Sequence, residues 1–404
     1  MRWENFLIDL FNLVVFLPHF FGDAPNLYDW FLLLGIALVI ALIWQRSQGD
    51  NPERERRYYY FLRIFVRFKL ASILFVAGFL KLFAIFTPEL SLSHLNTGYG
   101  YFADWKHLLL SLSVAPAYLV FLGVVEVAAA LLLLFRRTSF LAVIIIIPFY
   151  GNVFLANLAY GGAYYLSCLY IVLLTVPIFL YDLQRLGSLV VNLNSTFPSG
   201  WKFDWNSIRA GRWRWAVKLL FAFVFILAVG LRSYRVSTSE SLFYPTQKGL
   251  IGIAGKYTVE SFVLNGDSIP CSSEHPARWK DVVFEEWNTL SVRINDTIQA
   301  AHSTQLFDRV ESARDYEYTQ TGDRKYYRYQ SSAENSKLSL KNPNPAYQHD
   351  QVEFEIQRPD STHVYLFGRT ASGDSLRVQL AKVDKKYLLK EIKKVGRRKL
   401  GFRL

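Results

Sequence analysis

Only two cysteines occur among the 404 residues of the chain. Cys168 lies in an apolar run and Cys271 in a charged region, so the two cannot form a disulfide framework. The absence of a CxxC motif argues against a thiol–disulfide active site within the chain. Motifs for haem attachment and for flavin, nicotinamide or phosphate binding are also missing, and no Ser/His/Asp triad can be justified from spacing. The sequence therefore indicates no catalytic residue and no covalent cofactor, and an enzyme is not favoured.

Long apolar runs are abundant instead. Hydrophobic residues make up 52% of the chain and aromatic residues 16%, which are high values for a soluble protein. Apolar runs dominate before about residue 231, and charges with strand-like alternation take over after it. We therefore predict a fold in two parts: an all-α transmembrane helix bundle, followed by an all-β antiparallel barrel or sandwich.

About seven apolar segments approach the roughly 20 residues that a membrane-spanning helix requires. The first is short and is interrupted by Asp9, Asn12 and Pro18, so it either spans the membrane or lies at the interface. No small-residue cleavage site follows it, which argues against a removable signal peptide. The predicted spans are residues 5–21, 28–44, 70–87, 116–135, 139–158, 164–181 and 215–231.

Basic residues gather in alternate loops of the predicted bundle. They fill residues 45–69, recur as Arg136 and Arg137, and appear again in 182–214. The positive-inside rule assigns these loops to the cytoplasm, so the chain after about residue 240 should lie on the extracytoplasmic side. The predicted domains are 1–65, a membrane hairpin with its cytoplasmic loop; 66–185, a helical core; 186–235, a cytoplasmic segment with the last span; and 240–404, the β domain with its tail.

The hydrophobic pattern changes to a period of two from Gly255 onward. Segments such as KYTVESFVL, TLSVRIN and VEFEIQR alternate apolar and polar residues, and tight turns such as NG, TGD and ASGD separate them. About eight to ten strands of this kind favour a closed meander barrel, because closure removes exposed edges. Such a barrel is either packed solid or holds one small ligand. The Tyr-rich stretch 316–329 is predicted to form a cross-strand ladder.

Positive charge is concentrated at the C-terminal end of the chain. The net charge is +12, and the last twenty residues hold nine Lys/Arg against one Glu. Such a tail suits an anionic lipid surface or an acidic partner, or it is a solvated, frayed terminus. No aromatic–basic recognition module accompanies it, so nucleic acid is not expected as a partner.

Two apolar spans each carry one charge near mid-span. Lys81 lies in the first and Glu126 in the second. A lone charge at the bilayer centre costs about 2.5–3.5 kcal/mol on insertion scales, so opposite charges at similar depth on consecutive antiparallel helices are predicted to meet. Two interpretations stay open. Either Glu126 and Lys81 form a ligand-binding polar site, or they are a structural pair that fixes helix register, with Lys81 also able to snorkel to the interface.

Two further groups of polar residues have weaker patterns. Asn152 and Asn157 follow Pro148 in one span, and they are candidate ligand contacts or simple interhelical hydrogen-bond donors. An outer loop holds residue types that bind zinc or iron, but their spacing matches no standard site, so no metal is predicted. These loop residues are Glu89, His94, Asp104 and His107.

Several motifs resemble those of the DoxX-like family of bacterial membrane proteins. AGFLKLF at 77–83 fits the family's Gly-x-x-Lys through Gly78 and Lys81, and FLGVVEVAAALLLLFRR from 121 fits its Gly-x-x-Glu through Gly123 and Glu126. The resemblance extends to YGNVFLANLAY, to YDLQRL and to the first strands of the C-terminal region, which is similar to the lipocalin-like β domain of longer members. It implies a four-helix core, a bacterial inner membrane and a loose link to respiratory or thiol redox chemistry.

Three functions follow as expectations. The first is an accessory subunit of a redox or envelope-stress complex that binds a lipophilic molecule, such as a quinone, near Glu126, with a redox protein as its partner in the lipid bilayer. The second is a binding or transport protein whose β domain captures an apolar ligand and passes it to the bundle. The third is a structural envelope protein without a small-molecule site.

Overall fold

The chain is organised as two compact units. The computed structural model describes residues 27–48, 52–162, 164–190, 208–239, 243–272, 274–299, 301, 314–332 and 336–395. The helical unit comprises residues up to Phe86 and from Pro116 to Ser239, and the barrel unit comprises Thr87–Ala115 and the chain from Glu240 onward. The predicted two-part fold, helical and then β, is confirmed. The segment Thr87–Ala115, which we call the insert, falls in the barrel unit although it lies inside the predicted core of 66–185.

The helical unit is built from long, mostly apolar helices. Among the described residues, those apolar and long enough to cross a membrane are Leu27–Arg46, Pro116–Leu133, Ser139–Ala159 and Trp215–Thr238. The apolar part of the helix beginning at Tyr165 is shorter, and the predicted span 5–21 lies outside the described residues. The helices are α2 (Leu27–Gln48), α3 (Pro52–Leu82), α6 (Pro116–Leu133), α7 (Ser139–Ala159), α8 (Tyr165–Val190), α9 (Ile208–Ala222), the π-helical η3 (Phe223–Ala228) and α10 (Val229–Ser239).

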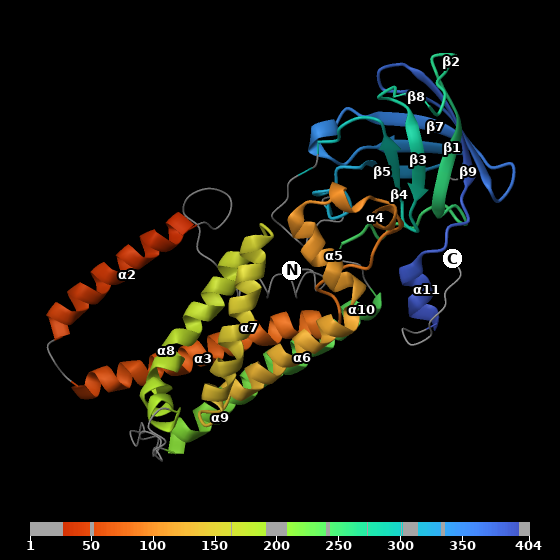
Figure 1. Ribbon diagram of the computed structural model, residues 1–404. Coiled ribbons are helices and arrows are strands. Elements are labelled where there is room, and N and C mark those ends of the chain that lie inside the picture. The colour runs from red at the N-terminus through yellow and green to blue at the C-terminus, as the bar shows by residue number, and fades with distance from the viewer. Residues whose placement is uncertain are drawn as a thin grey trace. The chain divides into compact units, whose positions relative to one another are not determined.

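Helix α3 is the central element of this unit and runs alongside α6 (Figure 1). Each of its residues from Leu70 to Leu80 is buried, as expected for a helix that is apolar all round. Proline opens both helices, at Pro52 and Pro116, where its missing N–H leaves no intrahelical hydrogen bond unmade.

The prediction of a loop over residues 45–69 is wrong at both ends, because α2 continues to Gln48 and the segment from Pro52 onward is the first half of α3. Its charged residues have high helix propensity, and two of them have partners inside the unit. The Arg67 guanidinium donates to the carbonyl of Leu133 at the end of α6, through Nε at 2.9 Å and Nη2 at 2.6 Å. Arg63 lies 3.3 Å from the ring centroid of Tyr181. The basic charges thus stabilise helix packing, a role that hydropathy does not reveal.

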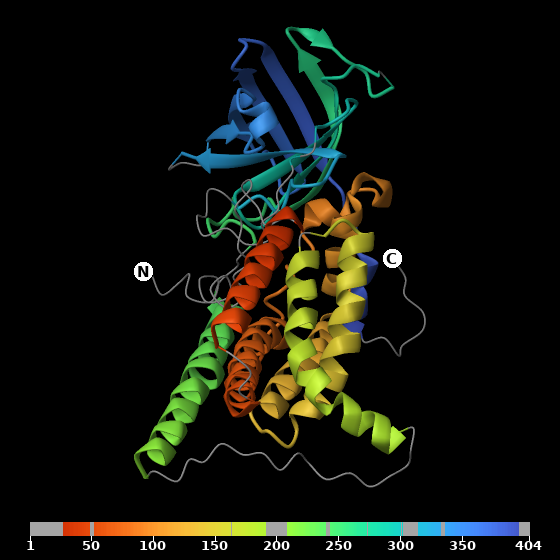
Figure 2. The same cartoon turned by 90° about the vertical axis from the view of Figure 1, so that its left-hand side faces the viewer.

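The barrel unit contains a closed, eight-stranded antiparallel meander. Consecutive strands pair with one another, and β1 also pairs with β9, so the sheet closes (Figures 1 and 2). The predicted closed meander is confirmed. The strands are β1 (Gly255–Leu264), β3 (Trp279–Phe284), β4 (Thr289–Ile294), β5 (Arg324–Ser331), β6 (Lys337–Lys341), β7 (Gln351–Gln357), β8 (His363–Thr370) and β9 (Ser375–Lys382), with the two-residue β2 (Asp267–Ser268) hairpinned onto β1.

Inward-facing side chains of the strands form one contiguous hydrophobic cluster. In β7, Val352, Phe354 and Ile356 are buried in it, whereas the residues between them are exposed. Tyr327 and Tyr329 of β5 also point into the cluster. The predicted ladder over 316–329 is therefore correct for β5 only, since Tyr316 and Tyr318 lie in the turn before that strand.

The insert covers the outer side of β3, β4 and β5. It contains the short helix α4 (Leu92–Leu95), the 3-10 turn η2 (Tyr99–Tyr101) and helix α5 (Asp104–Val114). Phe102 forms an isolated bridge with Thr321, just before β5. Side chains alternate along a strand, so Asp281, Val283 and Ser291 point outward, and this cover buries them. The remaining described helices of this unit are η5 (Pro345–Tyr347) and α11 (Leu388–Val395), which occupies part of the basic tail.

Candidate functional site

Close packing of α3 against α6 depends on two glycines. An added Cβ at Gly123 would lie 2.4 Å from the backbone nitrogen of Leu82 and 2.7 Å from the carbonyl oxygen of Gly78. An added Cβ at Gly78 would lie 2.8 Å from the Val127 side chain. Small residues at such a contact let two helix backbones approach closely. Lys81 and Glu126 each lie three residues after one of these glycines, so the Gly-x-x-Lys and Gly-x-x-Glu spacings bring the two charges to the same level.

The two charges meet, as the sequence predicts, but Lys81 lies in the last turn of α3, which ends at Leu82, so that only Glu126 lies at mid-helix. Lys81 Nζ lies 2.5 Å from Glu126 Oε1, and Glu126 is only 1% exposed. Tyr150, from α7, donates its hydroxyl to the same carboxylate oxygen at 2.7 Å. The rings of Phe86, Phe149 and Tyr150 lie 5.3, 6.0 and 5.9 Å from Lys81 Nζ, within cation–π range. Helices α3, α6 and α7 thus build one buried polar cluster inside the helical unit.

The second oxygen of Glu126 has no hydrogen-bond partner. Oε1 accepts from both Lys81 and Tyr150, whereas Oε2 is buried and unpaired among the described residues. A buried, unpaired carboxylate oxygen is costly, and native proteins usually supply it with a donor. The cluster can therefore accept one more hydrogen bond, from a hydroxyl or an N–H group.

The two asparagines predicted as ligand contacts do not join this cluster. Asn152 is exposed on the surface of α7, away from the buried stripe that contains Tyr150. Asn157 is buried, and its amide donates to the carbonyl of Val153 on its own helix at 2.9 Å. Because they are five residues apart, the two asparagines lie on different faces of the helix. Of the predicted site residues, Lys81 and Glu126 come together, and Tyr150 joins them.

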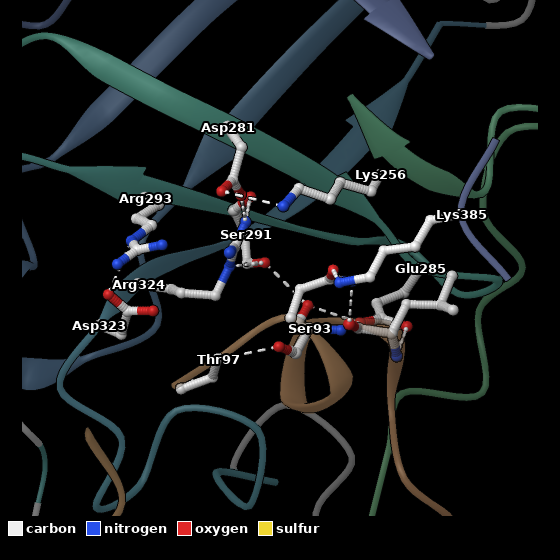
Figure 3. A network of polar contacts seen from close by, with 12 residues as sticks. Ser93, Thr97, Lys256, Asp281, Glu285, Ser291, Arg293, Asp323, Arg324 and Lys385 are labelled. Atoms are coloured by element: carbon white, nitrogen blue, oxygen red, sulfur yellow. Dashed lines mark hydrogen bonds and ion pairs between the residues drawn. The ribbon is translucent and has the colours of Figure 1, made fainter. Parts of the chain in front are cut away.

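A second polar cluster lies in the barrel unit, on the outer face of β3, β4 and β5 (Figure 3). Arg324 is 1% exposed and pairs with Asp281, and its Nε donates to Ser291 Oγ at 2.8 Å. Glu285 accepts from the backbone N–H of Ser93 at 2.7 Å and from that of Leu92 at 3.0 Å, at the start of α4. Burial raises the pKa of Glu285, and the hydrogen bonds from Ser93 oppose this. The network therefore fastens α4 of the insert to the barrel.

Lys106, from α5, is fully buried against the turn that precedes β5. Its Nζ donates to the carbonyls of Tyr316 and Thr319 at 2.6 and 2.8 Å, and to Thr321 Oγ1 at 2.8 Å. Burial lowers the pKa of Lys106 to about 7, although the carboxylate of Glu317 favours its charged form. Burial raises the pKa of Glu317 to about 7, and the nearby Glu285 adds to this shift.

The histidines of the insert are used in packing. His94 Nε2 donates to the carbonyl of Glu317 at 3.2 Å, and burial followed by the charge of Lys106 holds the pKa of His94 well below its usual value. The ring of His107 lies 4.0 Å from that of Tyr99. Within the described part of the chain, no group of three or more His, Cys, Asp or Glu residues is arranged to hold a metal ion.

Comparison with known proteins leaves the family of the chain open. No family model and no curated protein matches it. A redesigned β-barrel matches at 10% identity and a TM-score of 0.20, over 35% of this chain and 99% of that one. Bovine odorant-binding protein matches in complex with a selenium-containing odorant, at 10% identity and a TM-score of 0.22, over 37% of this chain and 80% of that one. The same bovine protein with undecanal matches at 13% identity and a TM-score of 0.21, over 36% and 81%. Scores this low carry no argument about ligands.

The sequence predicts the pairing of Lys81 with Glu126 but not the contribution of Tyr150. It does not predict the polar cluster on the outer face of the barrel. Tyr150 is one aromatic residue in an apolar span, and nothing in its spacing marks it. From the sequence alone, one would expect solvent-facing positions on half-buried strands for Asp281, Glu285 and Arg324. No local pattern indicates that these strands are covered on both faces, because TLSVRI alternates apolar and polar residues as a strand with one solvent face does.

Proposed function

We propose that this is a DoxX-like membrane protein whose helical unit binds a lipophilic, hydroxyl-bearing molecule of the quinol class at Lys81, Glu126 and Tyr150. The observation that carries the proposal is the buried, unpaired Glu126 Oε2. Lys81 pairs with the carboxylate inside the bundle, and Tyr150 holds its orientation through Oε1. A bound hydroxyl would supply the missing donor at Oε2. In this role the protein is an accessory subunit of a redox or envelope-stress complex in the bacterial inner membrane.

The Glu126→Gln variant should bind a quinol at least tenfold more weakly than the natural protein. Glutamine keeps an oxygen for Lys81 and Tyr150 but replaces the open acceptor with an N–H donor, which costs about one hydrogen bond, roughly 1.4 kcal/mol. The same change should favour the oxidised quinone, whose carbonyl accepts. Native mass spectrometry of the detergent-solubilised full chain, titrated with decylubiquinol and then with decylubiquinone, measures both affinities.

The Asn152→Ala variant is the matched control, since Asn152 is a polar residue of α7 that faces away from the cluster. It should bind decylubiquinol like the natural protein. A thermal melt of each variant shows whether the bundle stays folded. Equal quinol affinity in a folded Glu126→Gln variant would contradict the proposal, and so would the absence of quinol binding by the natural protein.

The alternation of basic segments supports an extracytoplasmic barrel unit. Because Cys271 is exposed and Cys168 is buried, a membrane-impermeant maleimide should label Cys271 in intact spheroplasts and leave Cys168 unlabelled. The Cys271→Ser variant should abolish labelling. Labelling that requires the membrane to be permeabilised would place the barrel unit in the cytoplasm instead and would reverse the predicted orientation.

The alternative in which the barrel interior captures an apolar ligand receives no support from packing. The inward-facing residues include Phe262, Trp279, Phe284 and Phe354, which lie within the contiguous core cluster. The cluster of Lys81, Glu126 and Tyr150, in which Glu126 Oε2 is the unpaired acceptor, is the better supported ligand site.

A further inference from the structure

A surface pocket of about 570 Å³ lies in the barrel unit, between the insert and the strand ends of β3, β4 and β5. Its size falls in the range of small-molecule sites, roughly 300–1,000 Å³. The insert contributes Tyr101 and Phe102, β3 contributes Lys280, β4 contributes Arg293, and the segment before β5 contributes Gln320 and Asp323. The pocket is separate from the cluster of Lys81, Glu126 and Tyr150, since none of the pocket residues belongs to the helical unit.

Asp323 presents an unused acceptor at this pocket. It is 6% exposed, and its Oδ1 accepts from Arg293 Nε at 3.0 Å, a pair visible in Figure 3. Its Oδ2 is buried and has no hydrogen-bond partner among the described residues. Arg293 thus fixes the carboxylate and balances its charge, while one oxygen stays available.

Gln320 presents a second unused acceptor. Its side-chain Oε1 is buried without a partner in the described part of the chain, whereas its backbone groups are paired with Ala301 and Ala103. Its φ of 52° lies in the left-handed region, which residues other than glycine rarely adopt. A non-glycine residue in this conformation with an unpaired buried oxygen makes the position a candidate functional one.

Charge and shape narrow the class of molecule that would fit. The charged residues that line the pocket are Lys280, Arg293, Asp296 and Asp323, whose formal charges cancel. A neutral ligand with several donors suits this balance, because an ion of either sign would meet no net opposite charge. The ring of Tyr101 is 49% exposed and offers an apolar face beside the two acceptors. Hydroxyl groups next to an apolar C–H face are the surface that a sugar ring presents.

We propose that this pocket binds a neutral saccharide, free or as part of a glycan chain. Asp323 Oδ2 and Gln320 Oε1 accept its hydroxyl hydrogens, and Tyr101 packs against a ring face. Binding would then satisfy two buried oxygens that are otherwise unpaired.

The test uses the full chain in detergent and measures binding by saturation-transfer NMR and isothermal titration. Cellobiose, maltose and N,N′-diacetylchitobiose are the neutral probes, and digalacturonic acid and chitosan dimer are their acidic and basic counterparts. At least one neutral disaccharide should bind, and the charged ones should bind at least tenfold more weakly. Sedimentation with insoluble chitin, a neutral polysaccharide, tests a polymeric source, which also supports the proposal when cellobiose or another neutral disaccharide competes.

Two variants connect binding to the two acceptors. Asp323→Asn and Gln320→Gly should each raise the Kd for the neutral disaccharide at least tenfold. Glycine adopts the left-handed conformation without strain, so Gln320→Gly removes the acceptor while keeping the fold. Asn265→Gly is the matched control, because Asn265 also has a positive φ, at 53°, and is not among the residues lining the pocket. It should leave the Kd unchanged.

Four results would overturn the proposal. The first is the absence of binding to every neutral probe, both soluble and polymeric. The second is a preference for an acidic or basic sugar. The third is unchanged affinity in a folded Gln320→Gly variant, since the pocket would then bind without its acceptor. The fourth is binding of calcium or magnesium ions alone that Asp323→Asn abolishes, because the pocket would then be a cation site and not a saccharide site.

Discussion

Replacing Gly123 with alanine should destabilise the helical unit by about 3 kcal/mol or more. The added Cβ would lie 2.4 Å from the nitrogen of Leu82, 2.7 Å from the oxygen of Gly78 and 2.9 Å from the Cα of Leu82. These are backbone atoms, so no side chain can rotate away, and α3 and α6 must separate. Overpacking costs about 1–3 kcal/mol, and weakening a buried ion pair adds to it. A thermal melt of the purified full chain in detergent measures the loss.

The matched control for Gly123→Ala is Gly151→Ala, in α7. Apart from its own stretch of helix, no described residue places a heavy atom within 4 Å of the Cβ position at Gly151, and alanine favours a helix by about 0.5–1 kcal/mol over glycine. This variant should melt at or slightly above the natural temperature. If both variants melt like the natural protein, the close approach of α3 and α6 is not required for folding.

Replacing Arg324 with methionine should loosen the barrel unit by about 3–5 kcal/mol. The change leaves Asp281 buried on the outer face of β3, with Lys256 at 3.5 Å as its remaining ion-pair partner among the described residues. Removing one partner of a buried ion pair costs this much because the other charge stays desolvated. A loss of about 3 kcal/mol corresponds to roughly 100-fold faster amide exchange wherever exchange follows global opening. Hydrogen–deuterium exchange of β3, β4 and β5 in the full chain measures it.

A double variant separates the charge effect from packing. Arg324→Met together with Asp281→Leu removes both charges and should recover much of the lost protection, since an apolar replacement of a buried pair is often neutral. Arg377→Met, on the exposed face of β9, is the control and should change exchange little. Equal exchange in Arg324→Met and Arg377→Met would show that the buried pair adds no stability.

The elements that sequence predicts correctly are those with a strong local signal. Lys81 and Glu126 stand out because a charge inside an apolar run is rare, and antiparallel neighbours bring equal depths together. The barrel follows from two-residue alternation and short turns, as in β7, where every second residue is buried. These patterns depend only on which face of an element meets the core.

The elements that escaped prediction depend on distant contacts. The first half of α3 looks like a loop because its arginines are polar, yet Arg67 bonds the end of α6, 66 residues later. Lys106 looks like a solvated residue of an outer loop, yet it is buried against carbonyls more than 200 residues away. The unpaired oxygens of Glu126 and Asp323 are properties of assembled sites, and residue type alone does not reveal them.

The insert has a consequence for the order in which the chain is made. Its partners are encoded late: Glu285 follows Ser93 by 192 residues, and the carbonyl that receives Lys106 follows it by 210. At about 5–20 residues per second, a ribosome needs roughly 10–40 s to reach them. Until then the ammonium of Lys106 has to stay hydrated. The barrel unit can therefore finish folding only after β9 has been made, because β9 closes the sheet against β1. A chain stopped before β5 would leave the insert without the residues that it packs against.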